Sequence, residues 1–384
     1  MTPSQEPDFL LNLIHPGNHI YFYPNPGNLG DILIAEATRQ FFYHKGIEFR
    51  EYNPDNPPSE NAPYTLIVGG GGLSYHWQGA DIMSKHLTSP QVQQGIILAH
   101  SFYGVDSFIQ SMDSRHILIC RDEASFEYCN RLNTQAKIIL GHDMALLWQD
   151  TALPLRNTDS NNEEEIEQMN LLERGWEKRV LNGVKKSTIT YNNKKIAFIL
   201  RKDKEKATTL DSPFSYDISI AYSSSCRETK YTNKLVAIFA KALSIPNIIV
   251  TDRLHVGMMG HLLGKEVYLL DNDYGKLSGV YHYSLKDAPN VHMLHQGVLT
   301  PELKKAWDLF NDERANLKPI HQEPEFQIIQ QIKKLKRKHK TAAIFAYILP
   351  GKYYHKRKEK LSNIIRMLTA DLDAMRQNKR TTNE

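Results

Sequence analysis

The chain has 384 residues, more than one hydrophobic core usually supports, so we expect it to form two domains. Hydrophobic residues make up 41% and charged residues 23% of the chain, which excludes a largely disordered protein. The formal net charge of +4 is small, and acidic and basic residues are mixed outside the C-terminal tail, which argues against a dedicated nucleic-acid-binding protein.

The three cysteines are Cys120, Cys129 and Cys226, and none lies in a Cys-x-x-Cys pair. This number and spacing predict neither a disulfide framework nor a metal site and favour a reducing cytoplasm. The first ten residues lack the basic and apolar segments of a secretory signal, and the longest apolar run near the end, 342–349, is too short to cross a membrane. We therefore expect a cytoplasmic protein.

The N-terminal part of the chain predicts strands that alternate with helices. A β-rich run at 19–23 is followed by a turn, and then by apolar residues at helical spacing over 31–43. Further short apolar runs are separated by helix-length segments such as 122–132, and this alternation predicts a parallel sheet covered by helices. The further runs lie at 64–68, 95–99, 116–120 and 137–140.

Beyond residue 150 the composition shifts to Asn, Asp, Glu and Lys, which predicts a polar boundary with a solvated helix near 163–181. A second alternating series follows, with strands expected at 195–200, 247–251 and 266–270 and helices at 232–243 and 255–263. We therefore predict an α/β fold in which two Rossmann-like lobes face a cleft, as in GT-B proteins. The predicted domains are an N-terminal lobe (1–150), a polar linker with a helix (151–193), a C-terminal lobe (194–320) and a basic helical tail (321–384).

The tail is dense in Lys and Arg at 333–340 and 352–360. Its first helical piece has one apolar face surrounded by basic residues, formed by Phe326, Ile329, Ile332 and Leu335. This pattern suits a helix that lies on an anionic membrane surface, with contact through 325–360. A helix that docks on the N-terminal lobe explains the pattern equally well, and both interpretations stay open.

A glycine-rich segment, 25–31, lies between the first predicted strand and its helix. We expect Gly27, Asn28 and Gly30 to contact a ligand, because glycines let the backbone approach closely and free amides at a helix N-terminus favour an anion. Asp31 has two interpretations, a functional group or an acid that caps the first turn of the helix.

Four consecutive glycines, 69–72, follow the strand at 64–68. Because glycine has no side chain, this segment leaves space for a ligand at the end of the strand, and we expect Gly70 and Gly71 to contact that ligand. A dinucleotide fingerprint would need a third glycine where Ser74 stands, so NAD is not expected to bind.

Charged residues follow two further strands of the first lobe. Arg121, Asp122 and Ser125 come after the strand at 116–120, and Asp143 comes after the next one, so all of them are expected at one edge of the sheet. The first three are predicted to bind substrate. The alternative is that Asp122 and Asp143 cap the helical segments that follow them.

In the second lobe, Arg201 ends a strand, while Arg253 and His255 lie between a strand and a helix. Arginine suits forked recognition of phosphate or carboxylate, and histidine is the natural proton carrier near neutral pH. A loop with Asp271 and Asp273 follows the third strand, but it lacks EF-hand spacing and an accompanying His or Cys cluster. No metal or cofactor is therefore predicted.

Taken in order, these residues resemble the polysaccharide pyruvyl transferases over roughly 20–285. The tail beyond about 318 lies outside the resemblance. The motifs that carry it are Gly27-Asn28-Leu29-Gly30-Asp31, the glycines 69–72, Arg121-Asp122 with Ser125, Arg201, Arg253-Leu254-His255 and Tyr274-Gly275-Lys276.

The resemblance implies a two-lobed enzyme that moves the enolpyruvyl unit of phosphoenolpyruvate onto two hydroxyls of a sugar, forming a cyclic ketal and releasing phosphate. It implies that His255 is the general acid/base, that Arg201 and Arg253 hold the phosphate and carboxylate, that Lys276 assists, and that Asp31 faces the acceptor. Tyr274 would also contact substrate. The acceptor would be a cell-surface polysaccharide or exopolysaccharide, or its lipid-linked precursor, at the inner face of the cytoplasmic membrane.

A glycosyltransferase that uses a nucleotide sugar is the main alternative, because glycine loops and arginines also suit a pyrophosphate. In that case Asp271 or Asp273 would bind the ribose hydroxyls. A non-catalytic binding protein with the same fold is disfavoured, since the Arg and His positions of the motifs are occupied. The oligomeric state does not follow from the sequence.

Overall fold

The computed structural model describes residues 7–14, 19–58, 63–75, 80–150, 176–203, 206, 210–221, 223–224, 229–271 and 275–315. The chain divides into two compact units, residues 1–211 with 215–310 and residues 212–214 with 311–384. Every element described below lies in the first unit, apart from the last two residues of the final helix. The predicted tail (321–384) and residues 151–175 of the predicted linker lie outside the described residues. Within the described ranges, no helix is both long and apolar enough to cross a membrane.

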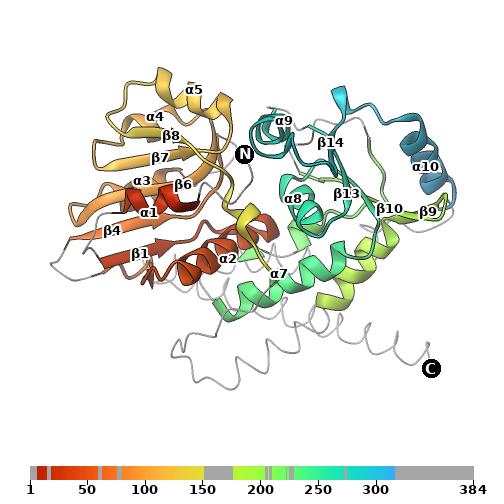
Figure 1. Ribbon diagram of the computed structural model, residues 1–384, viewed down its shortest axis with the longest axis horizontal. Coiled ribbons are helices and arrows are strands. Elements are labelled where there is room, and N and C mark those ends of the chain that lie inside the picture. The colour runs from red at the N-terminus through yellow and green to blue at the C-terminus, as the bar shows by residue number, and fades with distance from the viewer. Residues whose placement is uncertain are drawn as a thin grey trace, which may run out of the picture. The chain divides into compact units, whose positions relative to one another are not determined.

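The first sheet has seven strands, and all its pairings are parallel. They are β1 (His19–Tyr23), β3 (Arg50–Glu51), β4 (Tyr64–Val68), β5 (Gly71–Ser74), β6 (Val92–Tyr103), β7 (His116–Cys120) and β8 (Lys137–Leu140). The order across the sheet is β3-β1-β4-β6-β7-β8, with β5 paired to β6 beyond the end of β4. Figure 1 shows β1, β4, β6, β7 and β8 in this order. The chain runs from β1 to β3 on one side and returns to β4 on the other side, so the order reverses between β1 and β4.

Both faces of this sheet are buried, because successive strand side chains enter two different cores. On β1, Phe22 joins the core that contains α2, while Tyr21 and Tyr23 join the core on the opposite face. Burial on both faces explains why the strands read as continuous apolar runs. The helices of this part are α1 (Pro7–Leu13), α2 (Leu29–His44), α3 (Ala80–Leu87), α4 (Asp106–Gln110), α5 (Glu123–Arg131) and the short 3-10 helix η1 (Met144–Leu147).

The second sheet has five strands in the order β14-β13-β12-β10-β9 and is parallel except for the β9–β10 pair. Its strands are β9 (Thr188–Tyr191), β10 (Lys194–Ile199), β12 (Ile248–Thr251), β13 (Glu266–Leu269) and β14 (Val291–Met293). A helix over 176–186 precedes it. The other helical elements are η2 (Ile218–Ala221), α7 (Thr229–Leu243), α8 (Leu254–Leu262), α9 (Lys276–Val280), the π-helix η3 (Tyr281–Leu285), η4 (His295–Gly297) and α10 (Pro301–Asp312). The short strands β2 (Gly27–Asn28) and β11 (Ser223–Ser224) pair with each other.

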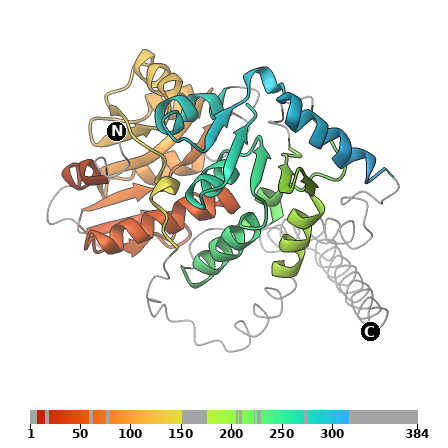
Figure 2. The ribbon, with the colours of Figure 1, turned by 45° about the vertical axis from the view of Figure 1, so that its right-hand side comes forward.

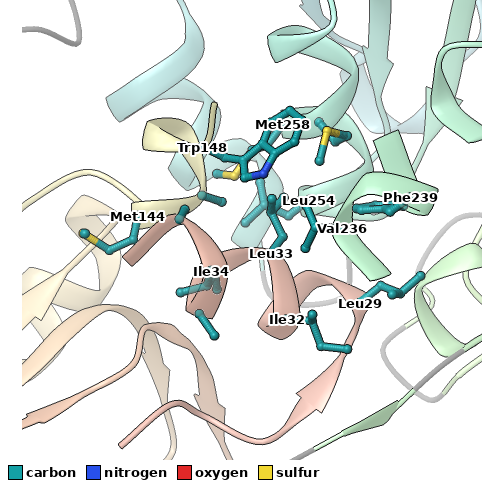
Figure 3. Close-up of a cluster of buried hydrophobic side chains, with 14 of the residues drawn as sticks. Leu29, Ile32, Leu33, Ile34, Met144, Trp148, Val236, Phe239, Leu254 and Met258 are labelled. Carbon is teal, nitrogen blue, oxygen red and sulfur yellow. The ribbon is translucent and has the colours of Figure 1, made fainter. Parts of the chain in front are cut away.

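Helix α2 joins the two sheets through a shared apolar core. It packs against η1, α7 and α8, and Figures 1 and 2 both show it beside α7. Figure 3 shows Leu33 of α2 in one cluster with Trp148 at the end of η1, Val236 of α7, and Leu254 and Met258 of α8. The parts of the chain that carry the two groups of predicted site residues are therefore held together by apolar burial.

The predicted α/β class with parallel sheets is confirmed, and several strands fall where the apolar runs predict them. The strand predicted at 95–99 is longer, Val92–Tyr103, because its last residues pair with β5, a glycine-containing strand that the apolar pattern does not reveal. The polar strand β9 and the short strand β14 were also missed. The predicted cleft between the lobes stays a prediction.

We predict that Leu33→Ala lowers the free energy of unfolding by about 2 to 5 kcal/mol, because the fully buried side chain would leave a cavity between α2 and its neighbours. Urea titration followed by circular dichroism measures the change. The control is Ile82→Ala on α3, where the side chain is 56% exposed and a change of less than about 0.5 kcal/mol is expected. Equal effects of the two substitutions would contradict the role given to the α2 core.

Candidate functional site

The two glycine-rich segments follow the two strands between which the sheet order reverses. Residues 25–31 come after β1, and residues 69–72 come after β4. Ligands of open α/β sheets bind outside the carboxyl ends of the strands at such a reversal, because the connections leave in opposite directions there and open a space between them. The fold therefore places both segments where a ligand of this kind of sheet would bind.

The start of α2 is closed by a reciprocal cap. Gly30 N donates to Asn28 Oδ1 at 2.8 Å, and Asn28 N donates to Asp31 Oδ2 at 2.8 Å. A Cβ atom at Gly27 would lie 1.9 Å from Asp31 Oδ2, so the carboxylate occupies the space that the glycine leaves. Asp31 thus caps the helix, one of the two interpretations made from the sequence, and its second oxygen lies 3.3 Å from the position of a Cβ atom at Gly71.

Burial raises the pKa of Asp31, although the neighbouring His255, the amide of Asn28, Lys276 and Arg121 act in the opposite direction. These neighbours come from four different segments of the chain. Asp31 is therefore a carboxyl group in a buried setting whose protonation depends on cationic side chains around it.

His255, at the start of α8, lies directly against the start of α2. A Cβ atom at Gly30 would be 2.3 Å from His255 Nδ1, so only glycine at this position leaves room for the imidazole. On its other side, His255 Nε2 lies 3.3 Å from Asp143 Oδ2. His255 is thus fixed between Gly30 of α2 and the carboxylate of Asp143, which follows β8.

Asp143 is fully buried and uses both of its oxygens. Oδ1 accepts from Ala145 N at 2.9 Å and caps η1, while Oδ2 accepts from Arg121 Nη1 at 2.5 Å and also faces His255. Burial alone would raise the pKa of Asp143, but the charges of Arg121 and His255 outweigh it and hold the pKa well below its usual range. Asp143 therefore caps η1, as one interpretation predicted, and is also a central charge of the site.

Arg121 is buried and has one nitrogen without a hydrogen-bond partner among the described residues, Nη2. Its Nε donates to Ser101 Oγ at 2.9 Å, so the guanidinium is held on two sides. A Cβ atom at Gly72 would lie 3.1 Å from Lys276 Nζ and 3.8 Å from Arg121 Nη2. Two cations therefore meet at a glycine in the second glycine-rich segment, which suits an anionic ligand.

His100 lies in the same place and was not singled out from the sequence as a site residue. It is fully buried, and its Nδ1 lies 2.7 Å from Leu98 O, which can only accept, so Nδ1 carries the proton. The pKa of His100 is lowered to about 4, chiefly by burial. Its Nε2 is consequently an acceptor, and it finds no donor within the described part of the chain. The apolar strand pattern stopped at Ala99, and only the pairing of His100 with Gly71 reveals its position.

Asp122 and Ser125, predicted to bind substrate, are both tied into the fold. Asp122 Oδ1 accepts from Ser125 N at 2.8 Å and caps α5, and Oδ2 accepts from Ser101 Oγ at 2.6 Å. Ser125 Oγ accepts from Phe102 N at 2.9 Å. Since Ser101 also accepts from Arg121, these residues hold the guanidinium in place.

The arginines of the second sheet form a separate cluster with acidic residues. Arg201 Nε and Nη2 donate to Asp203 at 2.9 and 3.3 Å, and Arg253 Nη2 lies 2.7 Å from the same carboxylate. Arg253 also donates two hydrogen bonds to Asp217, from Nε to Oδ1 at 2.9 Å and from Nη2 to Oδ2. Burial raises the pKa of Asp203, but Arg253 and Arg201 outweigh it and lower the pKa to about 2. The structure therefore brings the two arginines together but pairs each of them with a resident carboxylate.

The remaining residues singled out from the sequence are one glycine of the second glycine-rich segment and the loop before α9. Gly70 lies against the strand β6, since a Cβ atom there would be 2.7 Å from Ala99 O. Tyr274 and Asp273 lie outside the described residues. Asp271 Oδ1 accepts from the first amides of α9, Leu277 N at 3.1 Å and Ser278 N at 3.3 Å. In the described ranges, no group of three or more His, Cys, Asp and Glu side chains is arranged to hold a metal ion.

Parallel α/β sheets with glycine segments at a reversal of strand order place the chain among the α/β enzymes of Rossmann-like fold. The family model for polysaccharide pyruvyl transferase matches residues 28–274. The chain belongs to this family and is a pyruvyl transferase that acts on polysaccharide. The match favours this activity over that of a nucleotide-sugar glycosyltransferase.

Two individual proteins are also similar to the chain. A Bacillus subtilis (strain 168) protein named "Putative pyruvyl transferase EpsO" is 26% identical over 311 residues, which cover 74% of this chain and 91% of the relative. The crystal structure of an uncharacterized protein from Klebsiella pneumoniae subsp. pneumoniae has a TM-score of 0.56 and 24% identity, and covers 75% of this chain and 96% of that chain. The latter similarity concerns the fold alone.

We predict opposite pH dependences for two buried aspartates, Asp143 and Asp252, the residue before Arg253. Asp252 Oδ1 accepts from Arg201 N at 2.7 Å, its Oδ2 has no partner in the described structure, and burial raises its pKa to about 6. The unfolded value is about 3.9, so the protonated form stabilises the fold fully below about pH 4, and this contribution is lost as the pH rises through 6. Relative to Asp252→Asn, the wild type should lose about 2 to 3 kcal/mol of unfolding free energy between pH 4 and pH 7.

Asp143→Asn is the matched comparison, because the folded pKa of Asp143 lies below the unfolded value. Its contribution is present above about pH 4 and is lost as the pH falls through the folded pKa. The variant should therefore be less stable than the wild type at pH 7, and the difference should shrink in acid. Urea titrations at pH 3.5, 5.5 and 7 measure both series, and pH-independent differences would contradict the assignment of the charges.

Proposed function

We propose that the enzyme transfers the enolpyruvyl unit of phosphoenolpyruvate to two hydroxyls of a saccharide and so forms a cyclic ketal with release of phosphate. The observation that carries this proposal is the cationic position at Gly72, where Arg121 Nη2, which has no hydrogen-bond partner among the described residues, lies near Lys276 Nζ. A buried guanidinium nitrogen without a partner costs free energy, and a phosphate oxygen bound there would remove that cost. The position lies at the reversal of strand order, where ligands of such sheets bind.

In this proposal the carboxylate of the donor binds at Arg201 and Arg253. These guanidiniums already hold the carboxylate of Asp203 in a forked arrangement, so their geometry suits a group of this shape. The donor carboxylate would replace Asp203 there. Arg121 Nη2, which has no hydrogen-bond partner among the described residues, needs no such exchange, which is why we assign the phosphate to the position at Gly72 rather than to the arginines of the second sheet.

The proton transfers in the proposal involve His255 and Asp31. His255, protonated, gives its proton to the methylene carbon of phosphoenolpyruvate, and C2 becomes an oxocarbenium-like centre. One saccharide hydroxyl forms a C–O bond to C2 and loses its proton, for which Asp31 is a suitable acceptor because burial raises its pKa. The second hydroxyl then attacks C2, the C–O bond to phosphate breaks with its electron pair, and the hydroxyl proton leaves with the phosphate or returns to His255.

The proposal is tested by measuring phosphate release from phosphoenolpyruvate with and without β-galactosyl, glucosyl and N-acetylmannosaminyl acceptors, lipid-linked and free. Acceptor-dependent release and a product heavier by a pyruvyl ketal would support the reaction. Thermal shifts with phosphoenolpyruvate and with UDP-sugars provide a second measurement. Stabilisation by a UDP-sugar alone, without phosphate release, would instead support the nucleotide-sugar glycosyltransferase.

We predict that His255→Gln lowers kcat by about 10² to 10⁴-fold and leaves KM for phosphoenolpyruvate nearly unchanged, because the substitution removes the proton donor but none of the side chains proposed to bind the phosphate and carboxylate of the donor. Steady-state phosphate release gives both constants. The control is His261→Gln on the same helix. The imidazole of His261 pairs with Asn290 at 2.8 Å and takes no part in the proposed site. A normal kcat for His255→Gln, or an equal loss in the control, would contradict the role of His255.

A further inference from the structure

Tyr75 and Tyr103 form an exposed pair of aromatic rings, which we call the tyrosine pair. Their side chains are 60% and 44% exposed, and the ring centroids are 5.5 Å apart at an interplanar angle of 44°. By contrast, Tyr21, Tyr23 and Tyr52 are buried in the core of the same sheet. Exposed aromatic side chains in contact with each other are candidates for binding a partly apolar ligand.

The backbone holds the tyrosine pair in place. Ser74 and Tyr103 are register partners in the β5–β6 pair, and Tyr75 N donates to Tyr103 O at 3.1 Å directly after β5 ends. Gly104 then turns the chain with a φ of +64°, and a Cβ atom there would lie 2.8 Å from Tyr75 Cδ1. A side chain at position 104 would collide with the Tyr75 ring, so the glycine both permits the turn and leaves space for that ring.

The same two strands connect the tyrosine pair to the candidate site. Gly71 and His100 are register partners at the start of the β5–β6 pairing, beside Asp31. Tyr103 lies three residues beyond His100 on β6, and Tyr75 lies three residues beyond Gly72. Three strand residues span about 10 Å, which is further than one pyranose ring extends. The backbone of the pair therefore lies about the length of two sugar units along β5 and β6 from His100 and Gly72.

We propose that the tyrosine pair is a binding subsite for the saccharide acceptor and holds the sugar unit next to the one that receives the pyruvyl group. One face of a pyranose ring presents C–H groups, which pack on the face of an aromatic ring, while the hydroxyls at its rim can bond the phenol oxygens and water. The family acts on polysaccharide, so an acceptor with several sugar units is available to fill such a subsite. The inference rests on the proposed function for the position of the reacting sugar.

The first experiment compares acceptors of different length. In the double variant Tyr75→Ala/Tyr103→Ala, kcat/KM for disaccharide and tetrasaccharide acceptors should fall about tenfold. The value for the corresponding methyl monosaccharides should change less than about twofold, and KM for phosphoenolpyruvate should stay unchanged, because neither involves the second sugar unit. The double variant Tyr75→Phe/Tyr103→Phe keeps both ring faces and should retain most of the wild-type preference for longer acceptors.

The matched control is Tyr43→Ala. Tyr43 is 51% exposed near the end of α2, so its removal deletes a similar surface at a different place. Equal losses in the control and the alanine double variant, equal losses for monosaccharides and longer acceptors, or a loss in the phenylalanine variant as large as in the alanine variant would each overturn the inference. Thermal unfolding of every variant shows whether the fold is intact.

A second measurement separates this inference from the proposed reaction. Calorimetric titration with the same β-galactosyl, glucosyl and N-acetylmannosaminyl tetrasaccharides, without any donor, should show binding to the wild type that the alanine double variant loses. Binding that depends on the tyrosine pair, without turnover of phosphoenolpyruvate, would contradict the proposed donor and support the subsite. Turnover of phosphoenolpyruvate with no dependence on the tyrosine pair in either measurement would support the proposed donor and contradict the subsite. If no tetrasaccharide binds to the wild type, the subsite is also overturned.

Discussion

The carboxylate of Asp143 is the interaction on which the arrangement of the site depends. One oxygen caps η1, and the other faces both Arg121 from the first sheet and His255 from the second. Burying a charge without a partner costs several kcal/mol, so removing one member of this pairing would leave an isolated charge in the interior. The pairing therefore fixes the position of a histidine on α8 relative to the carboxyl edge of the first sheet, and it does so within an apolar core that α2 shares with both sheets.

The glycines explain how so many charged groups fit into one place. Gly27 leaves space for the carboxylate of Asp31, Gly30 for the imidazole of His255, and Gly72 for the ammonium group of Lys276. Each pair joins segments that are distant in the sequence, except for Gly27 and Asp31. Because a methyl group at any of these positions would meet a charged side chain at 1.9 to 3.1 Å, the glycines act by close approach rather than by a turn.

The charges of the site are distributed over two clusters with different balances. Around Gly72, Arg121 pairs with Asp143, whose pKa is lowered, while the pKa of the neighbouring Asp31 is raised, and Arg121 Nη2 has no partner among the described residues, so the cluster suits an added anion. Around Arg253, the carboxylates of Asp203 and Asp217 already balance the arginines. An anion entering the second cluster must compete with Asp203, and this competition would make binding there more selective for a group with the shape of a carboxylate.

The sequence by itself determined the α/β class, most of the long strands, the two glycine segments and the motifs of the polysaccharide pyruvyl transferases, because apolar periodicity and glycine runs are local properties of the chain. Residues 151–175 and the tail 321–384 lie outside the described structure, so the linker and membrane interpretations stay predictions. Only the tertiary structure decided which residues meet: Asp143 with His255, Asp203 with both arginines, and His100 with the glycine segment. Pairing across sheets depends on strand order and register, which no local pattern encodes, and β5 in particular is a glycine strand that becomes recognisable only through its partner.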